Sequence, residues 1–301
     1  MRPRTALRAA GLLVVVATAG CAGAAGNDTT LTPSTSASPE HAEAWSPHTI
    51  AATGQATCRT VVVAAGDIVN DVKVADRTGQ LARAQSPDLV LVLGDNQYNS
   101  GALTDYRAKY DRTSWGALKK LTNPVPGNHE YRTAGAAGYF AYFGNPPPYY
   151  TYDAGCGWRG YALNSETSIP EQIAWLRRDL AAHPCAPVLA SWHKPRFSSG
   201  TEHGGDRTLQ PFWDVLSSRK AVVLNGHEHN YERFAPVGQV REFVVGTGGS
   251  STYPFGSPTP GSQARLAHTP GVLRLELLPA GYRWAFLTAT ATGAVGDSGS
   301  S

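Results

Sequence analysis

This sequence of 301 residues lacks several features that would assign it to a special class of protein. The apolar run from Ala9 to Ala19 is too short, and too closely followed by small polar residues, to span a bilayer. No run of lysine and arginine occurs, the formal net charge is only +3, and aromatic residues do not alternate with basic ones, so we expect no nucleic-acid binding. No internal repeat is evident. What remains is a globular composition, 42% hydrophobic and 16% charged, suited to one large domain or two small ones.

The first 21 residues have the pattern of an export signal. Arg2, Arg4 and Arg8 precede the apolar run. The run ends in Thr18-Ala19-Gly20-Cys21, which resembles the bacterial lipobox, in which the cysteine is lipidated and anchors the protein to a membrane. Thr18 departs from the usual aliphatic residue there, and ordinary cleavage nearby would give a freely secreted protein. We therefore predict an exported protein, either a cell-surface lipoprotein or a secreted one.

Two segments are predicted to be disordered, and the long segment between them is predicted to fold as a domain. Residues 22–56 form a predicted tether, because small and polar residues dominate its sequence and cannot bury enough surface to fold. Residues 57–290 have the pattern of a single domain. Residues 291–301 predict a disordered tail.

Cysteine is scarce, with four residues in the chain. Without Cys21, three remain, Cys58, Cys156 and Cys185, which is an odd number for an oxidising compartment where thiols pair. Cys156 and Cys185 each precede a predicted strand, and a right-handed crossover would place both at the same end of parallel strands. We therefore prefer a Cys156–Cys185 disulfide, with the remaining cysteine free or paired elsewhere.

From Cys58 onward, short hydrophobic runs alternate with helix-like stretches, which predicts a layered α/β fold. A helix is predicted over Pro170 to Ala182, because Ile173, Leu176 and Leu180 fall on one face. The runs that predict buried strands are Thr60 to Ala65, Leu89 to Leu93, Pro124 to Val125, Pro187 to Trp192 and Ala221 to Leu224.

The pattern of hydrophobic residues changes after Glu232, where helical periodicity is weak. Glu242 to Val245, Val272 to Leu277 and Tyr282 to Leu287 predict antiparallel strands that complete a second sheet.

A polar cluster follows each of the five buried strands. The clusters are Gly66-Asp67, Gly94 to Tyr98, Gly127 to Glu130, His193, and Gly226 to Arg233. Sites in open α/β sheets form outside the carboxyl ends of the strands, so the five clusters are expected to converge. Each cluster alone has a simpler explanation, since Gly-Asp after a strand is a common turn and a lone His or Glu is usually packed or solvated. The five together, in one order, favour a site.

These motifs resemble the calcineurin-like metallophosphoesterases, and among them the purple acid phosphatases, whose pattern reads DxG, GDxxY, GNH(D/E), VxxH and GHxHxYER. The resemblance covers roughly Cys58 to Phe286. It implies a layered α/β/β/α fold, with two mixed β-sheets sandwiched between helices. It also implies that Asp67, Tyr98 and His229 bind a first metal, that Asn128, His193 and His227 bind a second, and that Asp95 bridges both.

The resemblance implies two metal ions per chain, iron plus a divalent Zn, Mn or Fe ion. Oxygen and imidazole ligands without thiolate suit these metals. Two ions about 3.5–4 Å apart can clamp the attacking and leaving oxygens of a displacement at phosphorus. A metal-bound hydroxide would then be the nucleophile, so that no Ser or Cys nucleophile is needed.

Two histidines are candidates for acid or electrostatic catalysis. His129 is contiguous with Asn128, and His203 lies in a loop after His193, where it is either a leaving-group acid or a surface residue. Arg196 is also close to His193 in sequence, although an Arg on such a loop is usually solvated.

The sequence departs from the family pattern in two places. The first motif reads Asp67-Ile68-Val69, without the third-position His of many metallophosphoesterases or the Gly of the purple phosphatases. Tyr98 would supply the replacement ligand, as a phenolate on ferric iron. The second departure is that only the predicted tether precedes Cys58, so we expect a minimal catalytic domain without the N-terminal β-sandwich of plant enzymes.

The leading hypothesis is hydrolysis of small-molecule phosphate monoesters. A phosphodiesterase or nucleotidase on the same site is the alternative within the same class. From another class, a surface lipoprotein that binds a phosphorylated ligand without turnover remains open. A membrane is expected as a partner only through a lipid anchor at Cys21.

Overall fold

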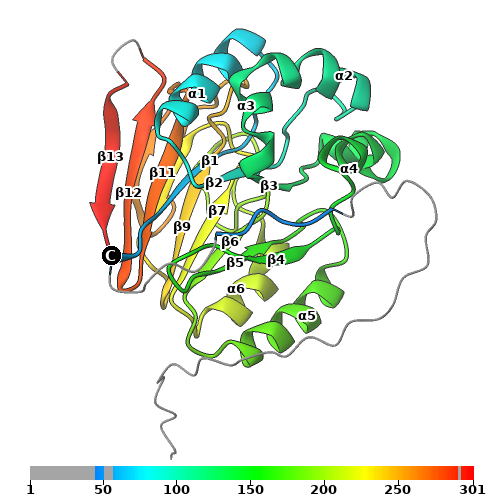
Figure 1. Ribbon diagram of the computed structural model, residues 1–301. Helices are drawn as coiled ribbons and strands as arrows, with labels where there is room; N and C mark the ends of the chain where they lie inside the picture. The colour runs from blue at the N-terminus through cyan, green and yellow to red at the C-terminus, as the bar shows by residue number, and fades with distance from the viewer. Residues whose placement is uncertain (1–44, 51–56, 291–292) are drawn as a thin grey trace, which may run out of the picture. The chain divides into compact units, whose positions relative to one another are not determined.

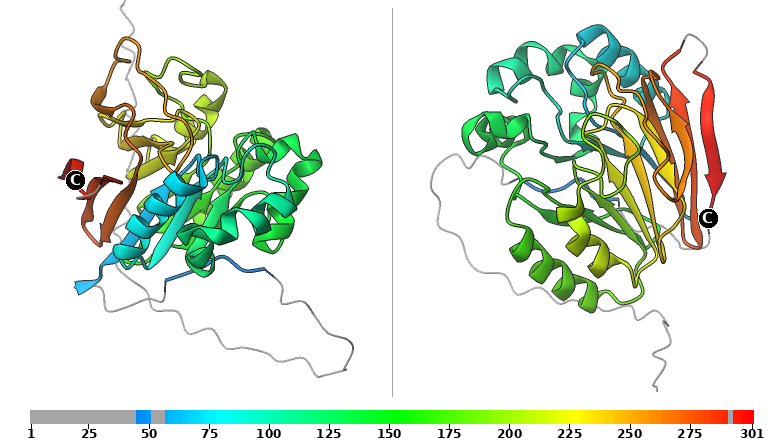
Figure 2. Two further views of the ribbon diagram at one scale, coloured as in Figure 1. Left: turned by 90° about the horizontal axis from the view of Figure 1, so that it is seen from above. Right: turned by 180° about the vertical axis from the view of Figure 1, so that it is seen from behind.

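A computed structural model describes residues 45–50, 57–290 and 293–301 of the chain. Two β-sheets pack against each other, and helices cover their outer faces (Figure 1 and Figure 2). The larger hydrophobic core joins the two sheets, because it contains Val62 and Leu91 of one sheet and Val222 and Val245 of the other. A smaller core lies between the second sheet and two helices. The predicted α/β/β/α layering is confirmed.

The first sheet has the strand order β13-β12-β11-β1-β2-β3. Its strands are β1 (Thr60–Ala65), β2 (Leu89–Leu93), β3 (Thr122–Val125), β11 (Gly271–Leu278), β12 (Gly281–Thr288) and β13 (Val295–Ser300). β1, β2 and β3 are parallel, whereas β11 is antiparallel to β1. Every residue of β1 and β2 is buried, as expected of strands that are covered on both faces.

The second sheet has the strand order β10-β8-β9-β7-β6-β5-β4. Its strands are β4 (Tyr150–Asp153), β5 (Arg159–Ala162), β6 (Val188–Ser191), β7 (Ala221–Asn225), β8 (Tyr231–Phe234), β9 (Val240–Val245) and β10 (Ser262–Leu266). β5, β6, β7 and β9 are mutually parallel.

Six α-helices and five short 3-10 turns connect the strands of the described residues. The helices are α1 (Val72–Ala84), α2 (Leu103–Ala108), α3 (Ser114–Ala117), α4 (Ala137–Phe143), α5 (Ile169–Ala182) and α6 (Gln210–Leu216). The 3-10 turns are η2 (Tyr110–Arg112), η3 (Lys119–Leu121), η4 (Glu130–Arg132), η5 (Ala134–Ala136) and η6 (Arg207–Leu209). Helix α1 begins directly after the first polar cluster, where the Asp71 side chain accepts from the N–H groups of Lys73 and Val74.

The prediction that the late strands complete a second sheet is wrong for two of them. β11 and β12 extend the sheet that contains β1. The strand at Glu242 to Val245 does lie in the second sheet, antiparallel to β8 on one side as predicted and parallel to β7 on the other. The pairing partner of a strand depends on tertiary packing, which alternation along one segment does not encode.

The predicted disordered tail is also wrong for residues 295–300. These residues form β13, which pairs antiparallel with β12 at the outer edge of the first sheet (Figure 1). The Asp297 carboxylate receives the Arg233 guanidinium at 2.7 Å, the Tyr231 hydroxyl at 2.7 Å and the Trp284 indole N–H at 3.2 Å. A polar strand is therefore ordered by backbone pairing and one ion pair rather than by a hydrophobic side.

Part of the predicted tether lies against the domain. The Trp45 ring packs edge-on against Tyr150, and the His48 N–H donates to the Asn123 side chain at 2.8 Å. The prediction of a tether is therefore wrong for residues 45–50. The predicted signal, including Cys21, and residues 22–44 and 51–56 lie outside the described residues.

The preferred Cys156–Cys185 disulfide is wrong, because Cys156 pairs with Cys58. Cys58 immediately precedes β1, and the turn before β5 brings Cys156 beside it. Cys156 and Cys185 both precede strands of the second sheet, whereas Cys58 precedes a strand of the first. The actual bridge joins the two sheets and closes a loop across a sequence separation of 98 residues.

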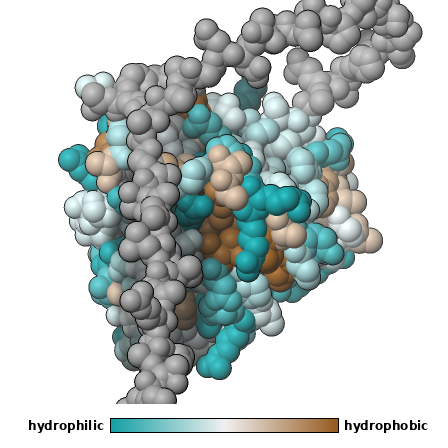
Figure 3. All heavy atoms as spheres, turned by 90° about the horizontal axis from the view of Figure 1, so that it is seen from below, coloured by the Kyte–Doolittle hydropathy of each residue, from teal (hydrophilic) through white to brown (hydrophobic). Residues whose placement is uncertain are grey.

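Few large hydrophobic side chains reach the surface of the described residues. Of the large hydrophobic side chains in the described residues, only Val72, Val237 and Val295 are exposed. In the view from below, hydrophobic colour gathers in one area near the middle of the visible face, and most of the remainder is hydrophilic or neutral (Figure 3). Among the described residues, no helix has both the length and the apolar character needed to cross a bilayer.

We expect Asp297→Asn to lower the free energy of unfolding by about 2 kcal/mol at pH 7, since it removes a charge-assisted acceptor that three side chains share. The Asp297 carboxyl has a lowered pKa, because Arg233 and Tyr231 outweigh the effect of burial. Its contribution to stability is therefore fully present above the pKa of an unfolded Asp and is lost as pH falls through the lower folded-state value.

Denaturant unfolding at a series of pH values checks this expectation. Asp105→Asn is the matched control, because the ion pair between Asp105 and Lys109 lies on the surface and should contribute less than about 1 kcal/mol. Equal losses in the two variants would show that Asp297 does not hold β13 in place.

Candidate metal centre

The loops after five strands meet at one edge of the sandwich and bring the predicted ligands together. Asp67 follows β1, Asp95 follows β2, Asn128 follows β3, His193 follows β6 and His227 follows β7. The backbones of Asp67, Asp95 and His227 have positive φ values of 59°, 49° and 71°. Residues other than glycine rarely adopt this left-handed conformation, and it is concentrated at functional sites.

Two glycines of the motifs are required because a carboxylate side chain lies directly against each of them. A Cβ atom on Gly127 would lie 2.3 Å from Asp95 Oδ1, and one on Gly226 would lie 2.6 Å from Asp67 Oδ2. Any side chain at these positions would displace a carboxylate. The glycines before Asn128 and His227 therefore allow the loops to close around Asp95 and Asp67.

The residues predicted for the first metal form one cluster. The Tyr98 hydroxyl lies 2.9 Å from Asp67 Oδ1 and 3.0 Å from His229 Nε2. Asp67 Oδ1 is 3.2 Å from His229 Nε2. The Tyr98 hydroxyl is also 3.2 Å from Asp95 Oδ2.

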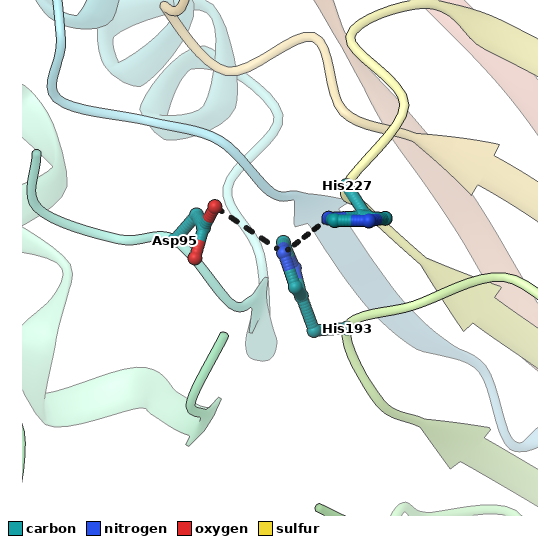
Figure 4. Close-up of side chains that lie close together, drawn as sticks. All are labelled: Asp95, His193 and His227. Carbon is teal, nitrogen blue, oxygen red and sulfur yellow. Dashed lines mark hydrogen bonds and ion pairs between the residues drawn. The ribbon is translucent and has the colours of Figure 1, made fainter. Parts of the chain in front are cut away.

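The residues predicted for the second metal form an adjoining cluster. His193 Nε2 lies 3.2 Å from Asn128 Oδ1. It also lies 3.2 Å from His227 Nδ1 and 3.3 Å from Asp95 Oδ2 (Figure 4). Ligand atoms of Asp95, His193 and His227 all lie within 4.8 Å of one another. The same oxygen of Asp95 therefore faces both clusters.

The donor set fits a cation. His193 Nδ1 is 2.8 Å from the Leu93 carbonyl, and His229 Nδ1 is 2.5 Å from the Ser251 carbonyl, so each Nδ1 carries a hydrogen and each Nε2 faces the centre. Around His193 Nε2 are a carboxylate oxygen, an amide oxygen and an imidazole nitrogen. One proton on His193 can satisfy only one of these contacts, whereas a metal ion accepts lone pairs from all of them.

The titratable groups at the centre shift one another's pKa values. Burial opposes ionisation of Asp95, but His193 and His129 outweigh it and hold the pKa of that carboxyl well below its ordinary value. Burial also opposes protonation of His193, yet Asp95 and Asp67 raise its pKa to about 10. Burial and the positive charge of His193 lower the pKa of His227 to about 2. In the metal-free protein, His193 therefore compensates the charge of Asp95.

Tyr98 reaches the first cluster although the usual third-position residue is Val69. The Tyr98 N–H donates to the Val69 carbonyl at 3.1 Å, and Val69 forms a parallel bridge with Gln97. The main chain of Val69 thus aligns the segment that carries the phenol. Burial, together with Asp67 and Asp95, raises the pKa of Tyr98 well above 10, so the hydroxyl keeps its proton without a metal.

The two predicted catalytic histidines border a pocket of about 320 Å³ over the centre. His129 Nε2 lies 3.8 Å from Asp95 Oδ2, and its Nδ1 is 2.8 Å from the Asn99 carbonyl. The His203 ring stacks on His227, with 4.2 Å between ring centroids. His203 is therefore beside the centre, although sequence alone left it open as a surface residue.

Several residues of the pocket carried no clear sequence signal. Asn70, Arg132 and Tyr253 line it, and the Tyr253 ring stacks on His229 at 4.0 Å. Tyr253 lies in the long loop after β9, outside every motif. Arg196, which the sequence offered as a phosphate contact, is not among the described residues that line this pocket, and its Nε donates to Gln210 at 2.6 Å.

Glu130 belongs to one of the polar clusters in the sequence, but the motif does not indicate its role. Its carboxylate is fully buried and accepts from the N–H groups of Asp95, Asn96, Gln97 and Gly127 and from the Tyr106 hydroxyl. The distances run from 2.7 to 3.2 Å. A buried carboxylate thus shapes the loop that presents Asp95 and Tyr98.

A layered sandwich with carboxylate, amide and imidazole donors gathered at its strand ends is the arrangement of a metal-dependent phosphoesterase. The family model of the calcineurin-like phosphoesterases matches residues 60–231, which is more than half of the chain. This protein belongs to the calcineurin-like phosphoesterase family.

Among curated proteins, the chain is similar to Purple acid phosphatase 15 of Arabidopsis thaliana, with 29% identity over 241 residues. The match covers 63% of this chain and 45% of that protein, so the chain spans less than half the length of this relative. The similarity supports the purple acid phosphatase-like character that the motifs indicated.

Solved structures show the same fold at low identity. GAP50, the anchor in the inner membrane complex of Plasmodium, has a TM-score of 0.69 at 15% identity, covering 80% of this chain and 88% of that one. The purple acid phosphatase PPD1 from yellow lupin (Lupinus luteus) seeds has a TM-score of 0.66 at 20% identity, covering 80% and 53%. PhoD has a TM-score of 0.57 at 12% identity, covering 83% and 69%.

We expect Glu130→Gln to destabilise the metal-free protein by about 3 kcal/mol, because an amide NH₂ would face N–H donors where a carboxylate oxygen now accepts them. We also expect metal affinity to fall about 10- to 100-fold, as the Asp95 loop loses its support. Denaturant unfolding and metal titration measure the two effects.

Glu242→Gln is the matched control for this prediction. Glu242 is equally buried but accepts only from the N–H groups of Arg196 and Phe197. It should lose stability without losing metal affinity. Unchanged metal affinity in Glu130→Gln would rule out the supporting role of Glu130.

Proposed function

We propose that this protein hydrolyses phosphate monoesters at a centre of two metal ions. The observation that carries the proposal is the pair of donor clusters that share one oxygen of Asp95. Asp67, Tyr98 and His229 would hold one ion, and Asn128, His193 and His227 would hold the other, with Asp95 between them. Iron together with Zn, Mn or a second Fe suits this set of oxygen and imidazole donors.

When bound, the metal ions supply an activated water and neutralise charge on the phosphoryl oxygens. The residues of the chain position the ester. In its protonated form, His129 can donate to a phosphoryl oxygen at the wall of the pocket. His203, stacked on His227 at the opposite cluster, can donate to the leaving oxygen as negative charge develops there.

Tyr98 distinguishes an iron centre of the purple phosphatase type from other metal pairs. Its raised pKa means that a phenolate forms only when a strongly charged cation replaces the proton. A ferric ion held there would do this and would give a visible charge-transfer colour. Tyr98 therefore reports which metal occupies the first cluster.

The fold by itself does not separate catalysis from binding, since a protein described as a membrane-complex anchor shares it. The complete donor set favours catalysis, because a binding protein has no need of seven ligands around two sites. The substrate class is proposed from the open, polar pocket, which His129, Arg132 and His203 border.

We expect protein purified from residue 45 onward to contain two metals per chain and to hydrolyse an aryl phosphate monoester faster than a diester. Chelation should abolish turnover, and Asp95→Ala should lower kcat/KM more than about 100-fold, because both sites lose a ligand. Metal analysis, steady-state kinetics and a visible spectrum measure these effects, and the colour should disappear in Tyr98→Phe.

Three outcomes would change the proposal. Metal and turnover without colour would remove Tyr98 as a phenolate ligand but keep the phosphoesterase. Faster hydrolysis of diesters would assign a phosphodiesterase. Protein without metal or turnover would indicate a phosphate-binding surface protein instead.

We further propose that the protein is exported and that Cys21 is its lipid attachment site. The pattern of the first 21 residues supports export, and the Cys58–Cys156 disulfide fits an oxidising compartment. In a bacterial host, the full chain should be found in the membrane fraction and Cys21→Ser in the soluble exported fraction. Retention of both in the cytoplasm would exclude the export signal, and equal release of both would exclude lipidation.

A further inference from the structure

The loop between β6 and η6, residues 194–206, carries His203 and contains no helix or extended strand. Its backbone N–H groups therefore need acceptors from elsewhere. Three glutamates of the second sheet and its loops accept from the N–H groups of Arg196, Phe197, Ser199, His203 and Gly204. Glu242 lies in β9, Glu232 lies in β8, and Glu228 lies between His227 and His229.

The first half of the loop is held by Glu242 and Glu232. Glu242 accepts from the N–H groups of Arg196 and Phe197 at 2.8 and 3.1 Å. Glu232 accepts from the Ser199 N–H at 2.7 Å and from the Ser199 hydroxyl at 2.5 Å. Neither glutamate contacts the half that carries His203 by a hydrogen bond among the described residues.

Glu228 holds the second half. Its Oε1 accepts from the N–H groups of His203 and Gly204 at 2.6 and 2.5 Å. The carboxyl group is buried and packs directly on Gly200, where a Cβ atom would lie 2.1 Å from Glu228 Oε2. The loop therefore turns around the Glu228 carboxylate from Gly200 to Gly204.

This contact links the loop to the metal centre through one short segment. His227 and His229 point their rings to the two donor clusters, and Glu228 between them points to the loop. Because the main chain of His203 is fixed on Glu228, its exposed ring comes to lie on the ring of His227. One tripeptide thus presents two ligands and fixes a third histidine beside them.

We propose that Glu228 is a positioning residue that holds His203 over the centre, and this inference rests on the proposed function. Motif patterns leave this position unspecified, and sequence alone favoured a solvated turn residue. Glu228 Oε1 accepts two short hydrogen bonds from the backbone, so that a loop without secondary structure keeps one conformation.

Hydrogen exchange in the metal-free protein tests the anchoring without any catalysis. In Glu228→Ala, amides in peptides covering residues 201–204 should exchange about tenfold faster or more. Glu242→Ala is the matched control, since it removes two comparable hydrogen bonds from the same loop but none from His203. It should change exchange near Arg196 and at Asp206, whose N–H donates to the Pro195 carbonyl, and leave residues 201–204 as they are. Unchanged exchange at 201–204 in Glu228→Ala would overturn the proposal.

A double-mutant cycle tests the effect on catalysis. On an alkyl phosphate, whose leaving group needs assistance, His203→Ala should lower kcat about 100-fold and Glu228→Ala about tenfold or more, with smaller changes in KM. In the His203→Ala background, adding Glu228→Ala should lower kcat by less than a further factor of about two. Equal losses in both backgrounds, or loss of bound metal in Glu228→Ala, would show that Glu228 acts on the ligands rather than through His203.

The conservative variant keeps the test decisive if Glu228→Ala does not fold. Glu228→Gln retains one acceptor oxygen, so it should show the same coupling to His203→Ala with a smaller loss of kcat. Additive losses in the Gln cycle would also overturn the proposal. If the wild-type protein hydrolyses no phosphate ester, the proposed function fails, whereas hydrogen exchange still decides whether Glu228 anchors the loop.

Discussion

Buried carboxylates need compensation, and this requirement shapes the edge of the molecule that carries the candidate metal centre. Asp67, Asp95, Glu130 and Glu228 all lie inside the protein at the ends of the strands. Each carboxylate is met by backbone N–H groups from loops rather than by lysine or arginine. Asp67 accepts from the His227 N–H and Asp95 from the His129 N–H, both at 2.8 Å. The loops are therefore folded around the charges, and the charges hold the loops.

The arrangement leaves the remaining lone pairs facing one another. Carboxylate oxygens of Asp67 and Asp95 that accept no backbone hydrogen bond point to the centre, where imidazole nitrogens and the Tyr98 hydroxyl surround them. A protein without a cation must keep protons there, as the raised pKa of His193 and the protonated Tyr98 show. Metal binding would replace those protons, and the unfavourable charge interactions of the metal-free centre would then favour a bound cation.

Residues farther from the centre fix the scaffold by the same kinds of contact. The Cys58–Cys156 bridge ties the start of β1 to the turn before β5 and thereby joins the two sheets. The last residues of the GHxHxYER motif serve the periphery, since Glu232 holds the loop after β6 while Tyr231 and Arg233 bind Asp297 of β13. A single motif therefore links ligands, a loop and an edge strand.

The sequence determined those features that local chemistry encodes. β1 and β2 have the predicted bounds, because strands buried on both faces read as unbroken hydrophobic runs. The polar clusters at strand ends contain the seven predicted ligands, which lie together because the carboxyl ends of parallel strands share one edge, whereas Tyr253 and His203 come from other loops. Tertiary structure alone decided the rest. Contacts between distant segments, for which neighbouring residues carry no signal, decide three features. They are the pairing of β11 and β12 with β1, the Cys58–Cys156 bridge, and the contact of Glu228 with His203.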